Sequence, residues 1–92
     1  MRDLNEIRKE INSIDEQLVK LFVQRMDCSK AVAEYKKANN IPILNVDREQ
    51  EVLDRAAAES GDYASYTRNL YEKIMKLSRD LQNQMIDGEA RG

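Results

Sequence analysis

Apolar side chains recur every three or four residues through the first third of the chain, which is the spacing of one face of an α-helix. This repeat lasts for more than four heptads and comprises Leu4, Ile7, Ile11, Ile14, Leu18, Leu21, Cys28, Val32 and Tyr35. It predicts one amphipathic helix over about residues 3–38. At about 1.5 Å per residue, such a helix is ~54 Å long.

A second, shorter helix is expected over residues 46–59. Pro42 lies in the stretch that separates the first helix from the next segment, and Asn45 is a good N-cap for the second helix. Asp47 and Glu49 follow in the first turn, where the helix dipole favours acidic side chains.

A third helix is expected over residues 63–86, after a break at Gly61 and with Asp62 as a plausible N-cap. Its apolar stripe consists of Tyr66, Leu70, Ile74, Leu77 and Leu81. The chain is therefore predicted to be all-α, with three helices that form one domain over residues 1–86. Residues 87–92 read as a disordered tail.

The first helix is too long for a compact chain of 92 residues. A globule of that size has a radius of gyration of ~12 Å and a diameter of about 30–35 Å. The helix extends beyond any core that its own chain can build, and a second copy is the natural cover. We therefore predict a homodimer in which the long helices are shared.

Composition excludes several classes of function. The net charge of −2 argues against nucleic acid or an anionic membrane surface as a partner. The chain has no His and one Cys, so His-based catalytic triads, His-ligated zinc and disulfide frameworks are excluded. No apolar window is long enough to span a membrane, and the charged start does not resemble a secretory signal. A cytoplasmic location is the simplest expectation.

A cation interrupts the apolar stripe of the first helix, because Arg25 stands where the repeat requires an apolar residue. Burying an unpaired cation costs several kcal/mol unless an anion meets it. Lys36 lies eleven residues later, at a rotation of only ~20°, so the two cations share a face with Ser29 and Val32. They suit one small anionic ligand. Alternatively, Arg25 sets helix register or pairs with a buried Glu, and Lys36 is solvated.

Polar residues also interrupt the other helices. Ser78 and Gln82 are one turn apart in otherwise apolar company, and Gln82 donates a hydrogen bond without titrating. Arg48 and Glu49 follow the expected N-cap of the second helix. The alternatives are a helix–helix polar contact for the first pair and a solvated first turn for the second.

A pocket built from these residues would hold several permanent cations, one acid and two neutral hydrogen-bonding groups. It suits a small dianion, and it suits catalysis by orientation and electrostatic preorganisation rather than by proton transfer or covalent attack. An intramolecular rearrangement in which charge separates in the transition state is the natural candidate.

Short motifs in this order point to a known family. They are LNEIR (4–8), INSID (11–15), LFVQR (21–25), AVAEYK (31–36), VDRE (46–49), and Ser78 with Gln82. Over residues 4 to about 85 the sequence resembles the all-α (type II) chorismate mutases. The resemblance implies an intertwined, three-helix homodimer that converts chorismate to prephenate without a cofactor.

The resemblance also implies roles for individual residues. Arg25 and the partner's Arg8 would clamp the two substrate carboxylates. Arg8 would come from the partner because, within one chain, it lies ~25 Å from Arg25 along the helix, too far to reach the same small ligand. Lys36 and Gln82 would face the ether oxygen, where negative charge grows as the carbon–oxygen bond breaks. The remaining implied contacts are Glu49 with the ring hydroxyl, Ser78 with a carboxylate, and Arg48 in support of this network.

Position 45 departs from the family pattern, which often has Asp there facing the ring hydroxyl. Asn45 keeps the shape and the capping ability of Asp but lacks its charge.

Two other functions stay open at this point. One is an isochorismate pyruvate lyase on the same scaffold, and the other is a non-catalytic helical dimerisation module in which Arg25 sets the register.

Overall fold

The computed structural model describes the backbone of residues 1–91 and the side chains of residues 1–88. Three α-helices, α1 (Leu4–Ala38), α2 (Val46–Ala58) and α3 (Ala64–Arg91), are joined by loops and by a 3-10 turn, η1 (Gly61–Tyr63). The prediction of three helices is confirmed, and there is no strand in this part of the chain.

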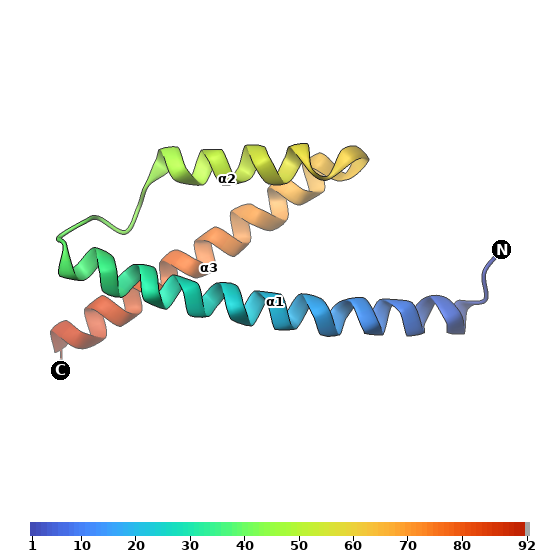
Figure 1. Cartoon of the computed structure of the whole chain (residues 1–92), viewed down its shortest axis with the longest axis horizontal. Helices are drawn as coiled ribbons and strands as arrows, with labels where there is room; N and C mark the ends of the chain where they lie inside the picture. The colour runs from blue at the N-terminus through green and yellow to red at the C-terminus, as the bar shows by residue number, and fades with distance from the viewer. Residues whose placement is uncertain (92) are drawn as a thin grey trace.

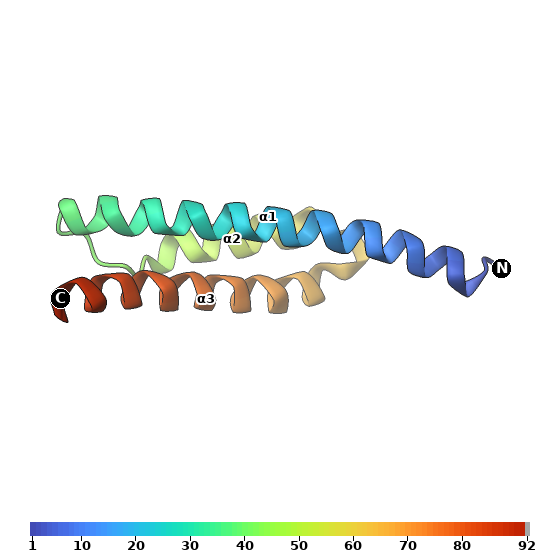
Figure 2. The ribbon, with the colours of Figure 1, turned by 90° about the horizontal axis from the view of Figure 1, so that it is seen from below.

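The molecule is elongated rather than globular. Its principal extents are 56 × 27 × 15 Å, and its radius of gyration is 16.8 Å. α2 and α3 form an antiparallel hairpin beside α1, and the N-terminal end of α1 projects beyond them (Figures 1 and 2). The long extent is close to the predicted length of the first helix, so one helix sets the size of the chain.

The loop between α1 and α2 reverses the chain as the Pro42 region predicts. Asn40 adopts a left-handed conformation at φ 56°, which Asn tolerates better than most residues. The prediction that Asn45 caps α2 is confirmed, because its Oδ1 accepts a 3.0 Å hydrogen bond from the backbone N–H of Arg48. This cap fixes the residue at which α2 begins.

The start of α3 differs from the expectation that Asp62 caps it. Gly61 is left-handed at φ +57°, and the chain then makes the η1 turn, which contains Asp62 and leads directly into α3 at Ala64. The α2–α3 hairpin is tied by an ion pair between Arg68 and Asp54 at 3.0 Å. The Arg68 hydrogen bond lowers the pKa of Asp54 below its usual value.

α3 continues to Arg91, past residue 86 where we expected the third helix to end. The difference has a simple cause, since Gly88 is the one weak helix former before Arg91 and a single Gly costs a helix only about 1 kcal/mol. Residue 92 lies outside the described residues.

The core of the chain is small and partly polar. The buried residues are Ala33, Ala57 and Met75, together with Ser29, Ser78 and Gln82. They lie where α3 packs against both α1 and α2, while α1 and α2 do not approach each other directly. The packing therefore leaves a space between α1 and α2, and α3 lies behind this space. In the described residues, no helix combines the length and apolar character needed to cross a membrane.

Candidate active site

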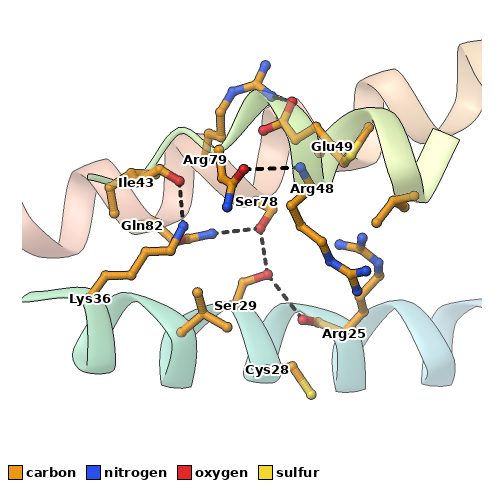
Figure 3. Close-up of a pocket in the computed structure, with 14 residues that line it drawn as sticks. Arg25, Cys28, Ser29, Lys36, Ile43, Arg48, Glu49, Ser78, Arg79 and Gln82 are labelled. Carbon is orange, nitrogen blue, oxygen red and sulfur yellow. Dashed lines mark hydrogen bonds and ion pairs between the residues drawn. The ribbon is translucent and has the colours of Figure 1, made fainter. Parts of the chain in front are cut away.

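A cavity of about 280 Å³ occupies the space between α1 and α2, with α3 forming its back wall (Figure 3). Its lining residues are Arg25, Cys28, Ser29, Val32, Lys36, Ile43, Asn45, Arg48, Glu49, Val52, Met75, Ser78, Arg79 and Gln82. This volume is at the lower end of the range for small-molecule sites, so it suits a compact ligand.

Two cations from α1 reach this cavity, as the helical spacing predicts. Arg25 is half-buried, and its guanidinium carbon lies 5.9 Å from the centroid of the Tyr71 ring, a cation–π contact. Lys36 is also half-buried, and its Nζ donates a 2.7 Å hydrogen bond to the backbone carbonyl of Ile43. Among the described residues neither cation has a carboxylate partner, so the alternative in which Arg25 pairs with a Glu of its own chain fails.

A row of buried polar groups lies at the α1–α3 contact. The Gln82 amide nitrogen donates to Ser78 Oγ at 3.0 Å, and Ser78 and Ser29 share a 2.6 Å hydrogen bond between their hydroxyls. Gln82 is 6% exposed, and its Oε1 has no hydrogen-bond partner. A buried polar atom without a partner is costly, so this amide is suited to a ligand group.

The first turn of α2 supplies the acid of the site. Glu49 pairs with Arg79 of α3, and both line the cavity. The Arg48 guanidinium instead donates from Nη1 to Glu51 Oε1 at 2.9 Å. The carboxylate of Glu49 is therefore supported by Arg79, whereas the family resemblance assigns the supporting role to Arg48.

Seven of the eight expected site residues line this one cavity: Arg25, Lys36, Asn45, Arg48, Glu49, Ser78 and Gln82. Arg8 does not, because it is exposed near the N-terminal end of α1. Two interpretations were offered for Ser78 and Gln82, a helix–helix polar contact and a place in the pocket. The structure shows both, because Ser78 bonds Ser29 of α1 and Gln82, and both residues line the cavity.

Arg79 and Cys28 line the site but are absent from the sequence-based set. Arg79 follows Ser78 and lies three residues before Gln82, so helical spacing places it on an adjacent face. That spacing was the available signal, but it does not distinguish a lining Arg from a solvated one. With Arg79 included, four cations and one carboxylate line the cavity, for a net charge of +3. The fold and site thus define a helical protein with a pocket for an anionic small molecule.

Comparison with known proteins identifies the family. A model described as chorismate mutase type II matches residues 7–83. The chorismate mutase of Methanocaldococcus jannaschii is 44% identical over 88 residues, covering 91% of this chain and 88% of that protein. A conserved hypothetical protein from Pyrococcus furiosus has a solved structure that matches with a TM-score of 0.74 and 39% identity, covering 86% of this chain and 93% of the other. The chain belongs to the type II chorismate mutase family, whose members are isomerases.

Other relatives carry further domains or a related activity. The bifunctional chorismate mutase/prephenate dehydratase of Aquifex aeolicus is 30% identical over 98% of this chain, but the match spans 20% of that longer protein. The 4-amino-4-deoxychorismate mutase of Streptomyces venezuelae is 30% identical over 79% of this chain and 74% of its own length. The chain thus spans about a fifth of the length of the bifunctional relative, but most of the length of the M. jannaschii and S. venezuelae mutases.

Proposed function

We propose that this protein converts chorismate to prephenate by a cofactor-free intramolecular rearrangement in the cavity between its helices. One observation carries the proposal. Two half-buried cations, Arg25 and Lys36, line the same cavity as the buried amide of Gln82. Desolvated cations without a carboxylate partner are costly, and a dianionic ligand offsets that cost. Membership of the chorismate mutase family supports this ligand.

Catalysis in this proposal is electrostatic. Arg25 binds a substrate carboxylate, and Ser78 assists it. Lys36 and Gln82 donate hydrogen bonds to the ether oxygen, where negative charge develops as the carbon–oxygen bond breaks. Lys36 uses one of its three protons on Ile43, so it retains donors for the substrate.

Gln82 can supply its donor after a half-turn of its amide. Its nitrogen now faces Ser78 while Oε1 is buried without a partner. After that turn Oε1 accepts from the Ser78 hydroxyl and the nitrogen faces the former position of Oε1. The oxygen and nitrogen of an amide are interchangeable in shape, so no other heavy atom moves. The two hydroxyl protons reorient with the amide, because Ser29 then donates to Ser78 instead of to the Arg25 carbonyl.

The ring hydroxyl of the substrate donates to the Glu49 carboxylate in this proposal. Asn45, which binds the backbone N–H of Arg48 through Oδ1, keeps its amide nitrogen for the same end of the substrate. Arg48 lines that end and completes the polar surroundings.

The working unit in this proposal is a homodimer that shares its sites. The chain exposes 7397 Å², whereas a compact monomer of its mass exposes about 5,500 Å². The excess of roughly 1,900 Å² per chain is in the range buried by permanent homodimers. Large apolar side chains along the N-terminal half of α1 remain exposed: Leu4, Ile11, Ile14, Leu18 and Leu21. An antiparallel partner that covers them also brings its Arg8 toward the cavity.

The test is a chorismate-disappearance assay on the purified chain, with prephenate identified by NMR and the mass in solution measured alongside. Turnover by a species of twice the chain mass supports the proposal. Release of pyruvate from isochorismate, without loss of chorismate, would identify the lyase alternative. A folded dimer that neither binds nor converts either compound would leave the dimerisation module as the function.

A further inference from the structure

A half-buried ion pair joins α2 to α3 at the wall of the candidate site. The Arg79 guanidinium donates from Nη1 to Oε1 of Glu49, and the two side chains are 31% and 25% exposed (Figure 3). A second ion pair between these helices, Arg68 with Asp54, is 42% and 59% exposed and lies outside the cavity. Solvent and salt therefore screen the Arg79 pair less.

Glu49 supplies the one carboxylate among the residues that line the cavity. Position 45 carries an amide, and its Oδ1 already accepts from the Arg48 backbone. The Arg48 guanidinium is bound to Glu51. Within the described chain, Arg79 is thus the side chain paired with the Glu49 charge, and no second carboxylate lies at this end of the pocket.

We propose that Arg79 is a positioning residue that makes the site select a neutral ring hydroxyl over an ammonium group, an inference that rests on the proposed function. Arg79 binds one oxygen of Glu49 and leaves the other to accept a hydrogen bond from a hydroxyl. An ammonium group in the same place would need a free carboxylate. It would instead meet a neutralised one in a cavity whose net charge is +3.

The experiment compares chorismate with its analogue that carries an amino group in place of the ring hydroxyl. For each compound, kcat and KM are measured separately, and binding is measured by calorimetry so that affinity is known without turnover. The variants are Arg79→Met, Arg79→Lys, Glu49→Gln and the double variant Arg79→Met with Glu49→Gln. Arg68→Met is the matched control, because it removes an ion pair between the same two helices outside the cavity.

We expect Arg79→Met to shift the amine-to-hydroxyl preference by roughly tenfold toward the amine, because it frees the Glu49 charge. Arg79→Lys should retain the wild-type preference, and Arg68→Met should leave it within twofold. In the Glu49→Gln background, Arg79→Met should no longer change the preference, since its effect acts through that carboxylate.

An unchanged preference in a folded Arg79→Met dimer overturns the inference while leaving the proposed function intact. An equal shift in the Glu49→Gln background also overturns it, because Arg79 would then act on the ligand directly. A wild-type protein that binds and converts neither compound overturns the proposed function and this inference together.

Discussion

The hydroxyls of Ser29 and Ser78 lie 2.6 Å apart in a buried hydrogen bond that joins α1 to α3 at the wall of the cavity. Ser29 Oγ also donates to the backbone carbonyl of Arg25 at 3.2 Å, and Gln82 donates to Ser78. Ser78 therefore donates its proton to Ser29, and the hydrogen bonds run in one direction from Gln82 to the α1 backbone.

Replacing Ser78 should destabilise the fold as well as the site. Ser78→Ala removes the partner of two buried polar groups, Ser29 and Gln82, and should lower the free energy of unfolding by about 1–3 kcal/mol. Urea unfolding at fixed protein concentration measures the change. Ser65→Ala on the exposed side of α3 is the control and should stay within about 0.5 kcal/mol. Equal effects of the two substitutions would contradict the importance of this contact.

Removing either site cation of α1 should abolish most activity while the fold is kept. Arg25→Ala and Lys36→Ala should each reduce kcat/KM by about 10²–10³-fold or more, because both groups act in a desolvated site. Circular dichroism and the mass in solution check the fold. Lys30→Ala, an exposed position on the same helix, is the control. Turnover within a few-fold of wild type in either site variant would show that the assigned role is wrong.

The rate should persist at neutral and alkaline pH, because the amide of Gln82 does not titrate. A Gln82→Glu variant carries a donor at the ether oxygen only when its carboxyl is protonated, which for an ordinary Glu needs pH below about 4.3. Its kcat/KM should therefore rise as pH falls, while that of the wild type does not. Profiles of the same shape for both proteins would exclude Gln82 as the donor.

Mixing two inactive variants should restore activity if the sites are shared between chains. Arg8→Ala and Arg25→Ala dimers, exchanged under mild denaturant and refolded together, form heterodimers in which one site keeps both Arg residues. The mixture should recover about half the activity per heterodimer, measured against each variant treated alone. Absence of recovery in a verified heterodimer would mean that each site is built from one chain.

The helices and the shared face of Arg25 and Lys36 were predictable from the sequence because both depend on local spacing. The eleven-residue offset from Arg25 to Lys36 places them on one face of any straight helix, and both line the cavity in the structure. The capping by Asn45 was predictable for the same reason, since it involves residues three apart. Asp62 was misjudged because the η1 turn absorbs it before α3 begins.

The partner of Glu49 could not be found in this way. Arg79 and Glu49 are thirty residues apart, and their contact depends on how α2 and α3 pack. The family resemblance instead assigned the supporting role to Arg48, whose guanidinium pairs with Glu51 one turn further along α2.

The sequence by itself determined that the chain is three helices, that the first is longer than its own core, and that cations interrupt its apolar stripe. These properties follow from periodicity, which acts through neighbours one or two turns apart. Only the tertiary structure decided that α1 and α2 stay apart around a cavity, that Ser29 meets Ser78, and that Arg79 pairs with Glu49. Those outcomes depend on the packing of distant helices, which no local pattern encodes.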